Sequence, residues 1–201
     1  MKILNLIWII TLIIDNMLPL ALARFYPNYS HKDMALSVLG SRQSPVKWVY
    51  NAWCIVSGVV FCIAPYAFYQ VNSGGLAVAI WILLAMYGIG CEIVSGFCPL
   101  NENRQEEDAI TKIHGVASAI GFMTLLVVPL LMAILQFQVS EVAFGLISIL
   151  CFVVAFVFFC FFIMGEKEMF ATTVLRYGGF WQRLVLVCCY VPLFVWCVIQ
   201  I

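Results

Sequence analysis

Three ionisable side chains lie within strongly apolar segments of this sequence. Glu92 precedes Pro99, which must end its helix, by seven residues; His114 lies about one turn into the next apolar run; and Asp15 precedes Arg24 by nine residues. At 1.5 Å per residue, Glu92 and Asp15 lie roughly 10 Å and 13 Å below the same polar end. A charge at the bilayer centre costs at least about 2.5–3.5 kcal/mol, so such groups usually face a partner or a wet cavity. The spacing predicts one shared polar pocket.

A carboxyl group and an imidazole that meet at one substrate can act as a general acid–base pair. Glu92 and His114 are therefore the candidate catalytic residues. Each candidate also has a structural alternative. Glu92 could pair with Lys112 or Arg183, His114 could bond a backbone carbonyl, and Asp15 could cap a kink before the next proline. The sequence leaves these alternatives open.

Several other chemistries are disfavoured by the residue inventory. The chain has two histidines, and His31 lies in a loop, so we reject a bis-histidine haem site. Zinc hydrolysis needs three protein ligands, which His31, His114 and a carboxylate could supply only if that loop folds inward. Ser95 and Ser118 are candidate nucleophiles near His114, but no G-x-S-x-G elbow accompanies them. We predict no metal, no cofactor and no nucleic-acid partner.

The composition is that of an integral membrane protein. Hydrophobic residues make up 65% of the 201 residues, charged residues 10%, and the mean hydropathy is +1.06. A soluble domain is about 45–50% apolar and about 25% charged, and a membrane helix takes roughly 20 apolar residues. The sequence predicts one all-α domain over 1–201, a polytopic membrane bundle of six transmembrane helices. The expected spans are 3–23, 47–70, 76–97, 110–135, 141–164 and 180–200.

The longest polar connection predicts one short interfacial helix in addition. Ser30 can cap a helix, Asp33 stands at its third position in a capping-box-like arrangement, and Gly40 suits its end. A helix of about nine residues is too short to cross a bilayer. We expect it to lie along the interface or fold over the bundle.

Small residues recur on the third and fourth spans. Gly88, Glu92 and Gly96 are four residues apart and share one helix face, as do Gly115 and Ser118 on the next helix. Small residues let membrane helices approach closely. We expect these two helices to form a tight hairpin closed by the 98–112 loop, whose acidic run over 106–108 is solvated.

The basic residues are distributed asymmetrically. Short loops rich in Lys and Arg stay cytoplasmic. We therefore expect a multi-pass plasma-membrane protein with both termini outside and the polar loops 24–47, 98–112 and 165–183 in the cytoplasm. Lys2 lies on the other side, and the remaining nine bases lie in or beside these loops: Arg24, Lys32, Arg42, Lys47, Arg104, Lys112, Lys167, Arg176 and Arg183.

The first span has an alternative interpretation as a cleaved signal peptide. Lys2, the apolar run and the small residues Ala21 and Ala23 fit that pattern. Asp15 and Pro19 within the run favour a retained helix.

Several motifs, taken in their order along the chain, resemble those of a known family. The stretches are YPNYSHKDMALSVLG, GIGCEIVSGFCPLNE, IHGVASAIGF and GGFWQR. In this order the chain resembles the bacterial six-helix membrane family called domain of unknown function 998, which implies the fold and the pocket position but no reaction. The matching residues are Pro27, Tyr29, Ser37, Leu39, Gly40, Gly96, Phe97, Pro99, His114, Gly115, Gln182 and Arg183.

The preferred functional hypothesis is the binding of a lipid headgroup or small amphiphile in a one-sided polar vestibule, as a sensor, carrier or accessory subunit. Arginine suits phosphate or carboxylate recognition. The alternatives are a membrane-embedded enzyme acting on a lipid or prenyl substrate with Glu92 and His114 as acid and base, and a proton-coupled transporter. Membrane lipid is the expected partner, a membrane protein partner is compatible with the sequence, and the oligomeric state is open. The predicted ligand-binding residues are Asp15, Tyr26, Tyr29, Arg42, Asn51, Glu92, His114 and Arg183.

Overall fold

The computed structural model describes residues 1–102 and 108–201, and every regular element in this part of the chain is helical. Six helical stretches are long and apolar enough to cross a membrane, which confirms the predicted all-α bundle. The long helices are α1 (Lys2–Leu22), α2 (Lys47–Ile63) with α3 (Pro65–Asn72), α4 (Gly74–Tyr87) with the π-helix η3 (Gly88–Val94) and α5 (Ser95–Phe97), α6 (Ala109–Gln138), α7 (Val142–Gly165) and α8 (Gly178–Ile199).

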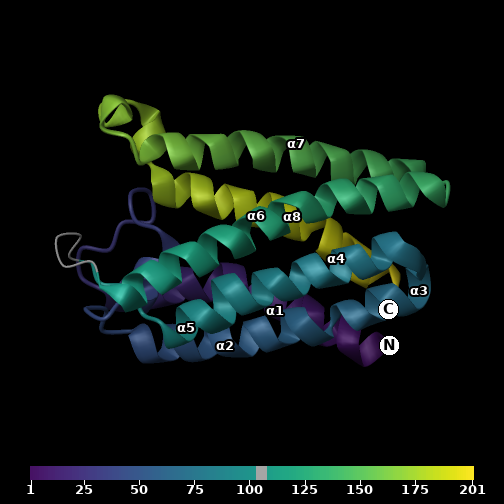
Figure 1. Cartoon of the computed structure of the whole chain (residues 1–201), viewed down its shortest axis with the longest axis horizontal. Coiled ribbons are helices and arrows are strands. Elements are labelled where there is room, and N and C mark those ends of the chain that lie inside the picture. The colour runs from purple at the N-terminus through teal and green to yellow at the C-terminus, as the bar shows by residue number, and fades with distance from the viewer. Residues whose placement is uncertain (103–107) are drawn as a thin grey trace.

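The helices run side by side along the longest axis of the molecule (Figure 1). Both termini lie at one end, together with the short turns, and the three long loops lie at the other end, which we call the loop end. Helix α7 has a mean hydropathy of 3.1 and packs against α6 and α8 only along part of its surface. Because each crossing switches ends, the first, third and fifth loops lie together at the loop end, and six crossings return the C-terminus to the end of the N-terminus.

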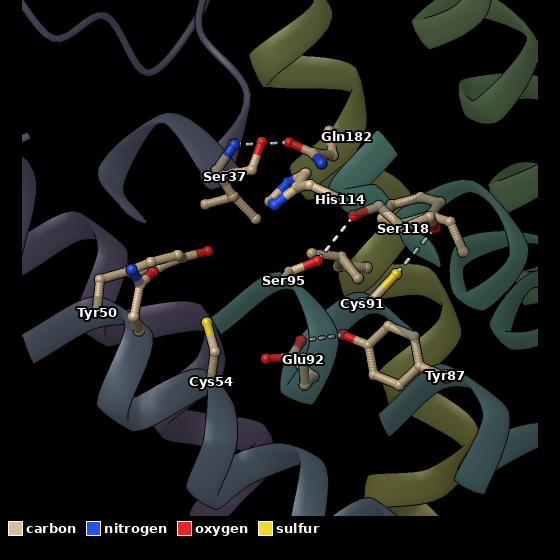
Figure 2. Close-up of a pocket in the computed structure, with 14 residues that line it drawn as sticks. Ser37, Tyr50, Cys54, Tyr87, Cys91, Glu92, Ser95, His114, Ser118 and Gln182 are labelled. Atoms are coloured by element: carbon tan, nitrogen blue, oxygen red, sulfur yellow. Dashed lines mark hydrogen bonds between the residues drawn. The ribbon is translucent and has the colours of Figure 1, made fainter. Parts of the chain in front are cut away.

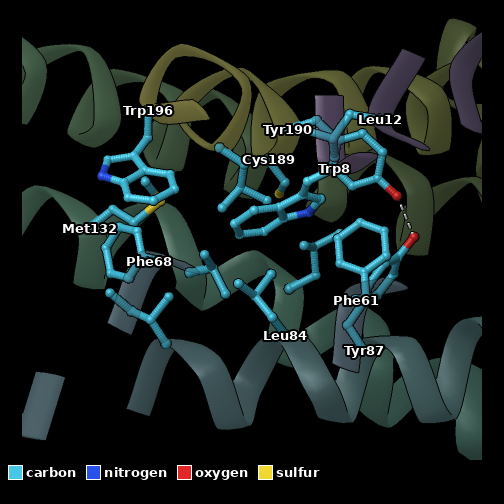
Figure 3. Packing of buried hydrophobic residues seen from close by; sticks show 14 of the residues in the cluster. Trp8, Leu12, Phe61, Phe68, Leu84, Tyr87, Met132, Cys189, Tyr190 and Trp196 are labelled. Carbon is cyan, nitrogen blue, oxygen red and sulfur yellow. Dashed lines mark hydrogen bonds between the residues drawn. The ribbon is translucent and has the colours of Figure 1, made fainter. Parts of the chain in front are cut away.

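Aromatic side chains fill the core between the helices (Figure 3). Trp8 of α1 is fully buried and lies edge-on to Phe61, with 6.5 Å between ring centroids. Phe61 in turn packs edge-on against Tyr87 at 4.8 Å, and Phe68 packs against Trp196 at 4.9 Å. Edge-to-face pairs contribute about 0.5–1.5 kcal/mol beyond burial. These rings join α1, α2, α4 and α8 directly beneath the polar residues described below.

The interfacial segment is shorter than expected. Ser30 and Asp33 form the predicted arrangement, with the Asp33 N–H donating to Ser30 Oγ at 3.2 Å, but the only regular element is the 3₁₀ helix η2 (Leu36–Gly40). The reason is competition for backbone groups. The Leu36 N–H donates to Gln182 Oε1 at 2.8 Å, and the Lys32 carbonyl, which would accept that N–H in an α-helix, accepts from the Phe180 N–H at 3.0 Å. These bonds fold the segment over the bundle instead of letting it form a nine-residue α-helix.

Glycines bring the third span close to two neighbours. A Cβ on Gly88 would lie 2.6 Å from the Gly58 carbonyl of α2, and a Cβ on Gly90 would lie 2.5 Å from the Ala117 carbonyl of α6. The predicted tight contact with the fourth span therefore runs through Gly90, because Gly88 faces α2. Gly115 has open space around it and makes no close approach.

Arg104 and the acids Glu106 and Glu107 lie outside the described residues. The predictions made for them stay predictions.

Candidate binding site

Three neighbouring cavities that share lining residues lie at the loop end of the bundle. The deepest, which we call the inner cavity, has a volume of about 80 Å³ (Figure 2). A water molecule needs about 10–15 Å³ by this measure, so the inner cavity has room for a few waters or one small polar group. Its polar lining comes from η2, α2, α6, α8 and the whole third span (α4, η3 and α5), and comprises Ser37, Tyr50, Asn51, Cys54, Tyr87, Cys91, Glu92, Ser95, His114, Ser118 and Gln182.

Glu92 reaches the inner cavity because its helix is locally π-helical. A π-helix pairs residues five apart, whereas an α-helix would put Tyr87 and Glu92 on different faces. In the structure the Tyr87 hydroxyl oxygen lies within hydrogen-bond distance of Glu92 Oε1, at 2.8 Å. Figure 2 shows the carboxyl group pointing into the cavity with the Cys54 thiol beside it. The wide turn over Gly88–Val94 thus exposes one carboxyl group to the cavity and hydrogen-bonds it.

Asp15 is joined to the same site from α1, although it does not line the inner cavity. Its carboxyl group accepts hydrogen bonds from Trp53 Nε1 at 2.7 Å, from the Ser57 hydroxyl at 3.0 Å and from the Tyr190 hydroxyl at 3.1 Å. The Tyr190 hydroxyl also contacts the Tyr87 hydroxyl at 2.6 Å. Two tyrosines therefore connect the carboxyl groups of Asp15 and Glu92.

His114 lines both the inner cavity and a larger one above it. Its Nδ1 lies 2.8 Å from the Cys98 carbonyl, so the ring is oriented by the end of the third span. Ser95 and Ser118 bond to each other at 2.8 Å beside it. The structure brings His114 and Glu92 to one cavity, but the described hydrogen bonds of the two side chains go to other partners.

The larger cavity, which we call the outer cavity, has a volume of about 710 Å³. It shares Ser37 and His114 with the inner cavity. Its charged lining among the described residues consists of the acids Asp33, Glu102 and Glu166, with no Lys or Arg. A volume of this size lies within the roughly 300–1,000 Å³ range of small-molecule sites.

Tyr26 and Tyr29, both predicted to bind a ligand, make contacts that hold the 26–40 loop in place. Tyr26 donates to Glu102 Oε1 at 2.6 Å, and the Ser41 hydroxyl contacts the same oxygen. Burial, together with the hydrogen bond to Glu102 and its charge, raises the pKa of Tyr26 to about 12. Tyr29 stacks on Tyr26 with 5.8 Å between ring centroids. Burial raises the pKa of Tyr29 also, against the opposing effect of Arg183.

Arg183 binds the protein's own backbone. Its Nη1 donates to the carbonyls of His31, Met34 and Gly179 at 2.8, 3.3 and 2.6 Å, and its Nη2 donates to the Tyr29 hydroxyl at 2.6 Å. These bonds direct both terminal nitrogens of the Arg183 guanidinium to the protein itself. Its evident task is to attach the 26–40 loop to α8.

Arg42 lies at a third cavity, which we call the lateral pocket. This pocket has a volume of about 370 Å³ and is lined by Arg42, Lys47, Trp48, Asn51 and residues of the third span. Asn51 also lines the inner cavity.

An ion pair holds Arg42 beside the lateral pocket. Arg42 Nη2 lies 2.6 Å from Asp108 Oδ2, and Asp108 accepts the Thr111 N–H at 2.9 Å as the N-cap of α6. These two bonds hold the pKa of Asp108 at about 2, so the pair is ionised at neutral pH.

Sequence reasoning missed Tyr87, Tyr190, Trp53 and Ser57. All four lie in apolar runs where tyrosine, tryptophan and serine are ordinary packing residues, and the five-residue spacing from Tyr87 to Glu92 carries no signal for an α-helix. No group of three potential metal-ligating His, Cys, Asp or Glu side chains occurs among the described residues.

Comparison with known proteins places the chain in a family. A family described as "Protein of unknown function (DUF998)" matches residues 9–199, which is nearly the whole chain. No curated protein and no solved structure gives a significant match. The six apolar helices of the structure agree with the assignment to a membrane family. The chain therefore belongs to the DUF998 family of membrane proteins of unknown function.

Proposed function

We propose that this protein binds the anionic headgroup of a membrane lipid or small amphiphile at the lateral pocket, as a sensor, carrier or accessory subunit. One observation carries the proposal: the basic lateral pocket shares Asn51 with the polar inner cavity. Arg42 and Lys47 would contact the headgroup, and Asn51 would stand between it and the inner residues Glu92 and His114. The acyl chain would lie in the bilayer.

The surroundings of the lateral pocket fit a headgroup at the membrane surface. Trp48 and Phe97 line it and are 80% and 69% exposed. Aromatic side chains of this kind concentrate at the level of the headgroups, and basic residues beside a helix end attract anionic lipids. Lys47 Nζ donates to the Arg42 carbonyl at 2.7 Å, so the two bases are held together.

Charge separates the lateral pocket from the outer cavity. Asp108 offsets one of the two bases, which leaves the lateral pocket with net charge of one positive unit. The charged side chains that line the outer cavity among the described residues are the acids Asp33, Glu102 and Glu166, so this lining offers no Lys or Arg to a phosphate or carboxylate. This difference favours Arg42 over Arg183 as the anion contact, because Nη1 and Nη2 of Arg183 already donate to backbone carbonyls and to the Tyr29 hydroxyl.

The enzyme alternative receives less support. An acid–base pair must meet at a substrate that fits between the two groups. Glu92 and His114 share a cavity of about 80 Å³, and their described hydrogen bonds go to Tyr87 and the Cys98 carbonyl.

The headgroup proposal predicts that Arg42→Gln with Lys47→Gln weakens binding of an anionic lipid. Charge-assisted hydrogen bonds contribute roughly 1.5–3 kcal/mol each, so we expect retention to fall by about tenfold or more. Native mass spectrometry of protein taken from vesicles of phosphatidylglycerol and phosphatidylcholine measures this. Lys112→Gln is the matched control, because Lys112 is exposed at the same end and lines none of the three cavities. Equal retention by the double variant and the control contradicts the proposal.

The distribution of bases supports a plasma-membrane orientation with the loop end in the cytoplasm and both termini outside. We expect a cysteine at Ser73, exposed in the turn between α3 and α4, to react with an impermeant thiol reagent on intact cells. A cysteine at Lys112, exposed at the loop end, should react only after the membrane is opened. The unsubstituted chain gives the background from its nine cysteines. The reverse pattern would invert the orientation.

A further inference from the structure

Four oxygen atoms form a continuous hydrogen-bonded chain through the middle of the bundle. Asp15 Oδ2 lies 3.1 Å from the Tyr190 hydroxyl, that hydroxyl lies 2.6 Å from the Tyr87 hydroxyl, and Tyr87 lies 2.8 Å from Glu92 Oε1. The middle contact is seen in Figure 3 and the last in Figure 2. Each hydrogen bond between two oxygen atoms needs one proton between them.

The two tyrosine hydroxyl groups supply one proton too few for the three contacts of this chain. There are three oxygen–oxygen contacts, and the hydroxyl groups of Tyr87 and Tyr190 supply two protons. If both tyrosines donated to carboxylates, no proton would remain for the 2.6 Å contact between them, and two sets of lone pairs would repel. The third proton must therefore come from a carboxyl group. A chain of this geometry is complete when one of the two carboxyl groups is protonated and the other is ionised.

Other donors indicate which carboxyl group holds the charge. Asp15 accepts from Trp53 Nε1 at 2.7 Å and from Ser57 at 3.0 Å in addition to Tyr190. Glu92 contacts the Tyr87 hydroxyl, and the Cys54 thiol lies beside its carboxyl group. Hydrogen bonds to the charged form favour that form. We infer that Asp15 and Glu92 share one proton through Tyr190 and Tyr87, with the proton resting on Glu92 and the negative charge on Asp15.

Among the described residues, no Lys or Arg side chain lines the inner cavity to balance the charge of a second ionised carboxyl group. The titratable groups that face the two carboxyl groups are Tyr50 and Cys54 of α2, Tyr87 of α4, Cys91 of η3, His114 of α6 and Tyr190 of α8. Like charges disfavour the simultaneous ionisation of two carboxyl groups in one site, and a membrane interior adds to the cost of each charge. One shared proton reduces two buried charges to one.

The chain also provides a route for proton transfer. Glu92, which opens onto the inner cavity, passes its proton to the Tyr87 oxygen; the Tyr87 proton moves to the Tyr190 oxygen; and the Tyr190 proton moves to Asp15. Each oxygen that gains a proton loses one, except at the two ends, so the charge moves from Asp15 to Glu92. The site is a proton-binding site whether or not the lateral pocket holds a lipid headgroup, and it gives the proton-coupled alternative a definite location.

Infrared spectroscopy of the full chain in lipid nanodiscs tests the shared proton. At neutral pH we expect the carbonyl band of one protonated carboxylic acid per chain. The band should disappear in Glu92→Gln and also in Asp15→Asn. In each variant the amide N–H supplies the third proton of the chain, and the remaining carboxyl group ionises. An unshared proton on Glu92 would leave the band intact in Asp15→Asn.

Glu141→Gln is the matched control, because Glu141 is exposed at the opposite end, and it should keep the band. Selective ¹³C labelling of glutamate in the unsubstituted protein should shift the band, so the assignment does not depend on a variant that folds. Absence of the band in the unsubstituted protein, its failure to shift with labelled glutamate, or its persistence in folded Asp15→Asn would overturn the inference.

Discussion

Replacing Arg183 with methionine should release the 26–40 loop from the bundle and lower the free energy of unfolding by about 2–4 kcal/mol. Methionine keeps an apolar stem but offers no donor to the carbonyls of His31 and Met34 or to the Tyr29 hydroxyl. Arg183→Lys should recover part of the loss, because an ammonium group cannot reproduce the planar fork that reaches backbone and tyrosine together. Denaturant titration in detergent measures the stability. Limited proteolysis within 26–40 measures the release of the loop.

Arg176→Met is the matched control for this prediction. Arg176 is also cationic and lies just before α8, but its side chain is 52% exposed and approaches Asp33 only to 3.9 Å. An exposed pair of this kind contributes about 0–1 kcal/mol. If both substitutions had the same small effect, the hydrogen bonds of Arg183 would not be what holds the loop.

The spans were predictable because bilayer thickness dictates length and the runs are apolar. The predicted 110–135 and 141–164, for instance, lie within α6 and within one residue of α7. The interruption at Pro65 and the π-helix within the third span were not predicted. An apolar run indicates that a segment crosses the membrane, but it carries little information on the backbone geometry within that segment. That local geometry places Glu92 beside Tyr87.

The polar pocket was predictable only from its charged members. Asp15, Glu92 and His114 were conspicuous because ionisable residues are costly in a membrane. The structure brings Glu92 and His114 to one cavity and links Asp15 to Glu92 through Tyr190 and Tyr87. The role of Arg183 depended on which acceptors its loop presents. Backbone carbonyls leave no trace in a sequence, so an arginine that binds its own loop looks the same as one that binds a phosphate.

Adding a single methyl group at Gly58 should destabilise the bundle by about 1–3 kcal/mol or more. The new Cβ would lie 2.5 Å from the Gly88 carbonyl and 2.9 Å from Glu92 Cβ, so α2 and the π-helix would have to separate. Because that movement displaces Glu92, Gly58→Ala should also change the infrared band of its carboxyl group, which links packing of the third span to the shared proton. Gly115→Ala meets open space and serves as the control, with unchanged or slightly raised stability. Equal unfolding midpoints for the two variants would mean that the glycine contact is looser than the structure shows.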